Sequence, residues 1–168
     1  VQGDYNAPTM QVKVGKKTVT VADPTKIVPA SLVADAITIL SNNWDDGDSG
    51  SDLGARRVSS KMTVNAAVIA GIVPTGGGYY SGGVENLLRL LEYWGSKTLT
   101  FNGSLVVLYP SQIATAPWGA TADVYEPPTR VWNWDSRFQD PAQLPPGTPE
   151  LRTAFRSQLA AIQPNTTK

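Results

Sequence analysis

Three similar stretches decide the fold expected of this chain: Ala34-Asp35-Ala36-Ile37-Thr38-Ile39, Val64-Asn65-Ala66-Ala67-Val68-Ile69 and Phe101-Asn102-Gly103-Ser104-Leu105-Val106. Each places Asp or Asn and then a very small residue inside an apolar run that favours β structure. Asp35 and Asn65 are 30 residues apart, and Asn65 and Asn102 are 37 residues apart. Asn and Asp tolerate unusual backbone angles, while Gly or Ala lets the chain turn tightly. The pattern therefore predicts strands joined by polar corners, repeated as the rungs of a β-solenoid. A β-sandwich is the alternative, because imperfect repeats also arise there by chance.

The composition excludes several classes of function. The 168-residue chain has no Cys and no His, so it cannot use disulfides, Cys or His metal sites, or a histidine acid–base mechanism. Its formal net charge is zero and only 17% of its residues are charged, which argues against a nucleic-acid partner. No apolar run is long enough to span a membrane. Many Thr, Ser, Asn and Gly residues with few charges suit an exported, β-rich surface protein.

The N-terminus suggests a piece of a longer protein. Val1 is not an initiator Met, and no signal peptide precedes it. The first six residues carry their own strand-and-corner pattern. We therefore expect an open first rung that another chain or a missing region covers.

The first 116 residues are expected to form the β-rich domain. Residues 10–22 alternate around Gly15 and predict a hairpin with its valines on one face. Residues 31–41, 62–73 and 98–110 are expected to form strands. Residues 82–94 predict one covering helix, because Val84, Leu87, Leu88 and Leu91 recur at helical spacing and leave Glu85 and Glu92 outside. A helix on a lipid surface is the alternative, although its polar face is poor in Lys and Arg.

Residues 117–168 are expected to form an arm packed on the same domain. Seven prolines punctuate residues 117–149, and the aromatic residues among them favour packing over a free linker. Thr148 and Pro149 then suit the N-cap and first position of a short C-terminal helix.

Several of these motifs together resemble one protein family. They are Gln2-Gly-Asp-Tyr-Asn6, Ala34 to Trp44, Val64-Asn-Ala-Ala67 with Ile69-Ala-Gly71, Tyr80 to Asn86, Leu99 to Leu105 and Pro127-Pro-Thr-Arg-Val-Trp132. The combination resembles the C-terminal part of bacterial type IV pilus minor pilin-like proteins and covers nearly the whole chain. The resemblance implies a β-solenoid-like ectodomain, no enzymatic activity, and other pilin-like subunits as partners. The hydrophobic N-terminal helix of that family is missing, so the chain is expected to be either an excised ectodomain or a piece that associates with a separate chain carrying that helix.

The sharpest polar cluster is the acidic loop at residues 45–52. Asp46, Asp48 and Asp52 offer hard oxygen ligands and form a candidate Ca²⁺ site. The alternative is a solvated acidic loop, because Gly50 interrupts the alternation and Arg57 stands where an EF-hand needs Glu. No other cofactor is expected.

Two further groups of side chains are candidate sites. Glu85 and Glu92 are seven residues apart and invite comparison with an acid–base pair, but solvated helix carboxylates are far commoner. Tyr125, Arg130, Trp132 and Trp134 form a candidate surface for assembly or for a ligand; the aromatic rings either stack on sugars or lie pinned over the core. Gly76-Gly77-Gly78 lacks the Lys of a phosphate-binding loop and is read as a turn.

The sequence thus predicts a structural subunit or ectodomain of an extracellular, pilus-like filament at the cell surface, acting by subunit assembly, adhesion or both. A carbohydrate-binding or carbohydrate-cleaving β-helix and a passive spacer are the alternatives.

Overall fold

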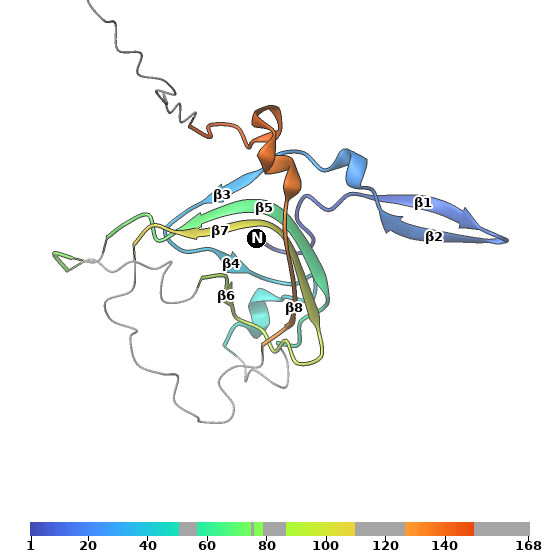
Figure 1. Ribbon diagram of the computed structural model, residues 1–168. Coiled ribbons are helices and arrows are strands. Elements are labelled where there is room, and N and C mark those ends of the chain that lie inside the picture. The colour runs from blue at the N-terminus through green and yellow to red at the C-terminus, as the bar shows by residue number, and fades with distance from the viewer. Residues whose placement is uncertain (51–56, 75, 79–86, 110–126, 150–168) are drawn as a thin grey trace, which may run out of the picture.

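The computed structural model describes residues 1–50, 57–74, 76–78, 87–109 and 127–149 (Figure 1). The strands form three sheets. An antiparallel pair joins β1 (Thr9–Val14) and β2 (Lys17–Ala22), and a short parallel pair joins β4 (Thr38–Ile39) and β6 (Arg89–Leu90). A four-stranded parallel sheet has the order β3 (Ser31–Val33), β5 (Met62–Ala70), β7 (Thr98–Val107) and β8 (Thr129–Trp134). The described residues also form four short 3₁₀ turns: η1 (Pro24–Lys26), η2 (Asp46–Asp48), η3 (Ser136–Gln139) and η4 (Pro141–Gln143).

The core lies on one face of the four-stranded sheet. Alternate residues of β5, from Met62 to Ala70, are buried, and β7 contributes Leu99 and Phe101. The other core side chains come from the opposing segments: Ile37, Ile39, Leu88 and Trp94. The period-two pattern of β5 and β7 therefore confirms the strands that the sequence predicts at 62–73 and 98–110.

Asparagines form a ladder across the outer face of this sheet. Asn65, Asn102 and Asn133 are register partners on β5, β7 and β8. Asn102 donates to Asn65 Oδ1 at 2.6 Å, and Asn133 donates to Asn102 Oδ1 at 2.9 Å. Asn65 donates to the backbone oxygen of Asn6 at 2.8 Å, and the Asn6 side chain returns a bond to the Asn65 carbonyl at 2.9 Å. Asn6 alone of the four has a positive φ, of 50°.

The ladder shows that Asn65 and Asn102 do not form the corners between strands that the sequence predicts. Asn65 and Asn102 lie inside regular strands, where their side chains bond from strand to strand. Asp35 does not align with them, because its backbone oxygen accepts from Gly71 N at 2.9 Å and its Oδ1 from Val73 N at 3.1 Å. The 37-residue spacing thus reflects true register, whereas the 30-residue spacing is a coincidence of composition.

The predicted fold of solenoid rungs with a covering helix is wrong. The sheets are small, with two, four and two strands, and one of them is antiparallel. No α-helix occurs among the described residues. The chain is strand-rich, as the sequence indicates, but the three stretches do not form repeated rungs.

The described part of the expected helix at 82–94 is not helical: it holds the short strand β6 and a bridge at Tyr93, and Leu88 has a positive φ of 52°. Residues 79–86 lie outside the described ranges. Arg89 N donates to Ile37 O at 2.8 Å and Tyr93 N to Arg57 O at 2.6 Å, so these amides bond to distant segments rather than to a helical turn. The exposure departs from the helical prediction at two positions, since Glu92 is only 1% exposed and Leu91 is 37% exposed, whereas Leu88 is buried as predicted. Leucines at helical spacing also suit a strand whose neighbours bury both faces, which explains the error.

The predicted hairpin is confirmed. Val12 pairs with Val19 and Met10 with Val21, and Gly15 takes the positive φ of 63° that its turn needs. Every residue of the two strands is exposed, however, so the shared valine face does not belong to the core. The expected C-terminal helix after Thr148 lies in residues 150–168, outside the described ranges.

Gly103 is required where β7 passes β5, and this gives a first prediction. A Cβ at residue 103 would collide with the carbonyl oxygen of Ala66, its register partner. We expect Gly103→Ala to destabilise the protein by roughly 3 kcal/mol, since backbone atoms relax poorly around an inserted methyl group. Urea unfolding followed by tryptophan fluorescence measures this cost. Gly50→Ala, in open space, is the matched control and should change stability little.

A second prediction concerns the ladder. Asn102→Ala removes the amide that donates to Asn65 and the oxygen that accepts from Asn133, so both neighbours lose a hydrogen bond. We expect a loss of about 2 kcal/mol, which is typical when partly buried polar groups are left unpaired. Asn133→Ala, at the exposed end, should cost clearly less in the same urea titration. Equal costs at the two positions would contradict a ladder that stabilises the interior of the sheet.

Candidate binding surface

Glu92 is a structural carboxylate. Its Oε2 accepts from Ser41 N at 2.5 Å and its Oε1 from Ser41 Oγ at 2.6 Å. Ser41 Oγ in turn accepts from Ser60 N at 2.9 Å, and Ser41 is itself fully buried. This network ties the segment after β6 to the segment after β4. The solvated position predicted for Glu92 is therefore wrong, and its suggested partner Glu85 lies outside the described residues.

The acidic loop is organised by its own side chains. Asp45 Oδ1 accepts from Gly47 N at 2.8 Å at the start of η2, and Asp46 Oδ1 accepts from Trp44 Nε1 at 2.7 Å. Within the described residues, no group of three acidic side chains is placed to hold a metal ion. Asp52 lies outside them, so the Ca²⁺ site at Asp46, Asp48 and Asp52 stays a prediction.

Three residues of the candidate surface meet on β8. Arg130, Trp132 and Trp134 alternate along the strand and pair with Leu99, Phe101 and Gly103 of β7. Trp132 meets Phe101 edge-on at 6.5 Å between ring centroids, and the Arg130 guanidinium carbon lies 5.4 Å from the Trp132 ring centroid. Both indoles remain open to solvent, with Trp132 48% and Trp134 58% exposed. Tyr125, the fourth residue of the prediction, lies outside the described ranges.

β8 is an edge strand of the sheet. In the part of the chain that the structure describes, β8 pairs only with β7. Its pairing ends at Trp134, opposite Gly103, although β7 continues to Val107. Residues 104–107 of β7 therefore have no described strand beside them on that side. A hollow of about 510 Å³ lies here, lined by Phe101, Gly103, Ser104, Leu105, Val106, Trp132, Asn133 and Trp134. Such an edge offers unpaired backbone groups to another strand.

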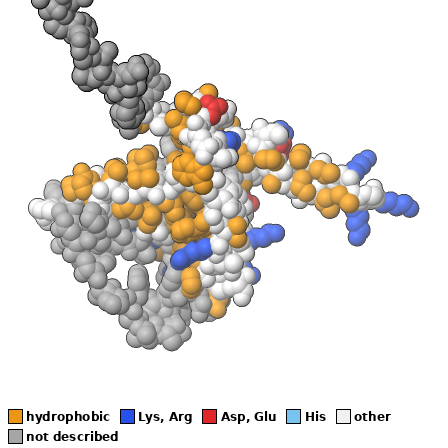
Figure 2. All heavy atoms as spheres, in the orientation of Figure 1, with side chains coloured by type: hydrophobic (Ala, Val, Ile, Leu, Met, Phe, Trp, Pro, Cys, Tyr) orange, Lys and Arg blue, Asp and Glu red, His pale blue; other side chains and the backbone are white. Residues whose placement is uncertain are grey.

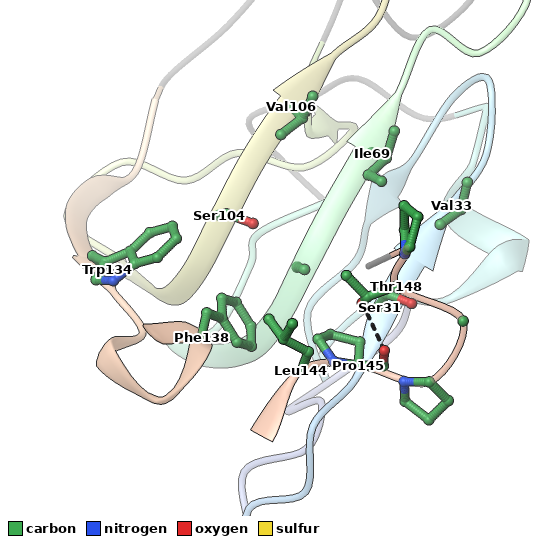
Figure 3. A pocket seen from close by; sticks show the side chains of 14 residues that line it. Ser31, Val33, Ile69, Ser104, Val106, Trp134, Phe138, Leu144, Pro145 and Thr148 are labelled. Atoms are coloured by element: carbon green, nitrogen blue, oxygen red, sulfur yellow. Dashed lines mark hydrogen bonds between the residues drawn. The ribbon is translucent and has the colours of Figure 1, made fainter. Parts of the chain in front are cut away.

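A second hollow, of about 310 Å³, runs across the outer face of the sheet (Figure 3). Two rows of register partners form its floor. The first row is small, with Ser31, Ala67 and Ser104, and the second is aliphatic, with Val33, Ile69 and Val106. Trp134, Phe138 and Leu144 to Pro149 form its wall. The small row makes the groove deep and the aliphatic row makes it apolar.

An ion pair fixes this wall against the rest of the molecule. Arg137 donates to both carboxylate oxygens of Asp135, and its Nη1 donates to Ile27 O at 2.9 Å. Asp135 Oδ1 also accepts from Arg137 N at 3.1 Å and so begins η3. The hydrogen bonds from Arg137 hold the pKa of the Asp135 carboxyl below its ordinary value. This Asp135–Arg137 clasp keeps Phe138 in contact with Trp134, and the centroids of the two rings are 5.7 Å apart.

Sequence reasoning missed the groove and the outer end of the ladder. Asn133 stands 31 residues after Asn102 in a similar apolar context, so a search for further Asn at strand centres would have found it. The groove has no comparable signal, because its rows depend on register between β3, β5 and β7.

The clasp predicts how stability depends on pH. Because the pKa of Asp135 is lowered on folding, its contribution is present above the ordinary pKa of 3.8 and is lost as the pH falls through the lower, folded value. We expect Asp135→Asn to cost about 2 kcal/mol at pH 7, as for hydrogen bonds to charged groups. The cost should shrink below pH 4 in urea titrations of both proteins. A cost that stays constant over this range would contradict the assignment.

Comparison with protein-family models, curated proteins and solved structures finds no match to this chain.

Proposed function

We propose that this chain is a structural subunit or ectodomain of an extracellular filament, and that it acts by joining its open sheet edge to a neighbouring subunit. The resemblance of its motifs to minor pilin-like proteins suggests the type IV pilus class of filament. The observation that carries the proposal is the edge strand β8, which presents two exposed indoles beside a stretch of β7 that no described strand pairs on that side. Exposed edges normally carry charges or covers that block pairing, and aromatic side chains invite it.

The edge supplies both parts of a strand-addition interface. Backbone groups of β8 and of residues 104–107 supply hydrogen bonds, and the pockets beside Trp132 and Trp134 supply apolar contact. Aromatic residues dominate the energy of protein interfaces because they bury large area with few rotatable bonds. The mechanism therefore needs no catalytic group. Its partners are other pilin-like subunits, including one that carries the hydrophobic N-terminal helix.

Carbohydrate binding is the second candidate, and the same two indoles favour it. Trp132 and Trp134 stand two residues apart on one strand, so their Cα atoms are separated by roughly 7 Å. Exposed rings at such a distance suit successive sugar units. The Arg130 guanidinium, which lies over the Trp132 ring, competes for one stacking face.

The test of the proposal is the state of the native material. Electron microscopy should show ordered filaments, and mass spectrometry of every chain present should identify a helix-bearing pilin beside this one. A lone monomer without companion chains would contradict the assembly mechanism.

Substitution of the edge aromatics gives a sharper prediction. Trp132→Ala and Trp134→Ala should each reduce incorporation into filaments at least about tenfold, because an interface aromatic contributes roughly 2 kcal/mol or more. The fold should survive, since both side chains are largely exposed. Tyr109→Ala, which removes an exposed aromatic outside β8, is the control.

The same variants separate the candidates. Under carbohydrate binding, a polysaccharide that binds the native protein raises its melting temperature, and both tryptophan variants lose that shift. A passive spacer shows neither assembly nor stabilisation.

A further inference from the structure

The β1–β2 hairpin stands away from the rest of the molecule (Figure 1). Among the described elements, neither of its strands packs against any element other than its hairpin partner. An isolated two-stranded hairpin is marginally stable at best in water. Its extended form therefore needs a surface to lie on.

One face of the hairpin is suited to such a surface. Met10, Val12 and Val14 share it with Val19 and Val21, all five of them exposed, and Lys17 joins this face opposite Val14 at the tip. Figure 2 shows these hydrophobic side chains along the hairpin and basic side chains at its tip. The opposite face carries Gln11, Thr18 and Thr20 and is polar. An exposed, contiguous apolar face of this kind marks an interaction site.

The charge of the hairpin limits its partner. Residues 9–22 hold three lysines, at positions 13, 16 and 17, and no acidic residue. Because the formal net charge of the chain is zero, the remaining residues hold three more acidic than basic side chains. The hairpin and the remainder of a second copy therefore carry net charges of opposite sign, which favours their association.

The outer groove matches the hairpin in chemistry and size. Among the described residues that line the groove none is charged, and its aliphatic row of Val33, Ile69 and Val106 crosses three strands over about 10 Å. The hairpin face from Met10 to Val14 is about 13 Å long. Two β layers of this kind pack face to face about 10 Å apart.

We propose that the hairpin of one copy packs its valine face into the outer groove of the next copy. This inference rests on the proposed function and adds a second contact to the β8 edge. Hairpin and groove are different surfaces, so the contact is head-to-tail, and repetition of such a contact builds an open filament rather than a closed dimer.

The absence of cysteine from the chain allows a direct test. Single-cysteine proteins, one carrying Val12→Cys and one carrying Val106→Cys, are co-assembled in native filaments and oxidised mildly. Disulfides form only between Cα atoms within about 7 Å of each other. We expect the mixed V12C–V106C dimer to be the main covalent product. Thr18→Cys, on the polar face of the hairpin, is the matched control and should lose that product when paired with V106C. Lys16→Glu with Lys17→Glu should also lower its yield.

Other outcomes overturn the proposal in distinguishable ways. Predominant V12C–V12C dimers would show that hairpins pair with each other. Filaments that form normally but give no V12C product would remove the hairpin contact and leave the β8 mechanism standing. Flotation of the native chain with vesicles of equal phosphatidylglycerol and phosphatidylcholine, lost in Val12→Asp, would assign the valine face to an anionic lipid surface. If no filament exists in the native material, the proposed function fails first.

Discussion

The register of the parallel sheet is the constraint on which the rest of the structure depends, and side-chain hydrogen bonds between asparagines enforce it. A slip of one residue in β7 would move Asn102 to the core face and Phe101 to the outer face. The ladder excludes this slip, because Asn65, Asn102 and Asn133 must meet to pair their amides. Asn6 extends the same network to the N-terminal segment. Gly103 is part of this constraint, since only a residue without a side chain passes the Ala66 carbonyl there.

Once the register is fixed, the functional surfaces follow from it. The row that contains Val33, Ile69 and Val106 and the adjacent small row form the outer groove. The end of β8 opposite Gly103 leaves the last residues of β7 open and brings Trp134 to the rim of both hollows. The Asp135–Arg137 clasp then holds the wall beside them. The fold thus concentrates its exposed apolar side chains at an edge, a groove and a hairpin, and the buried Glu92 provides internal support.

Part of this arrangement was predictable from the sequence. The hairpin followed from alternation around Gly15, and the long strands followed from the apolar runs at Val64 and Phe101, because these signals are local. The prediction of repeated rungs was wrong because Asp35 resembles Asn65 in its sequence context but lies beside Gly71. Register depends on which two segments pair, and one segment alone does not reveal it. The helix was wrong because Leu87, Leu88 and Leu91 fit a helical period that long-range pairing with β4 overrides. The pairing of Arg130, Trp132 and Trp134 with β7 needed the sheet order as well.

The most direct test of the account is amide hydrogen exchange of the native filament compared with the dissociated chain. Some amides of residues 129–134 and 104–107 do not bond within the sheet. Strand addition predicts that these amides exchange rapidly in the free chain and become strongly protected in the filament. Unchanged exchange at both segments, with protection confined to other parts of the chain, would contradict assembly through the open edge.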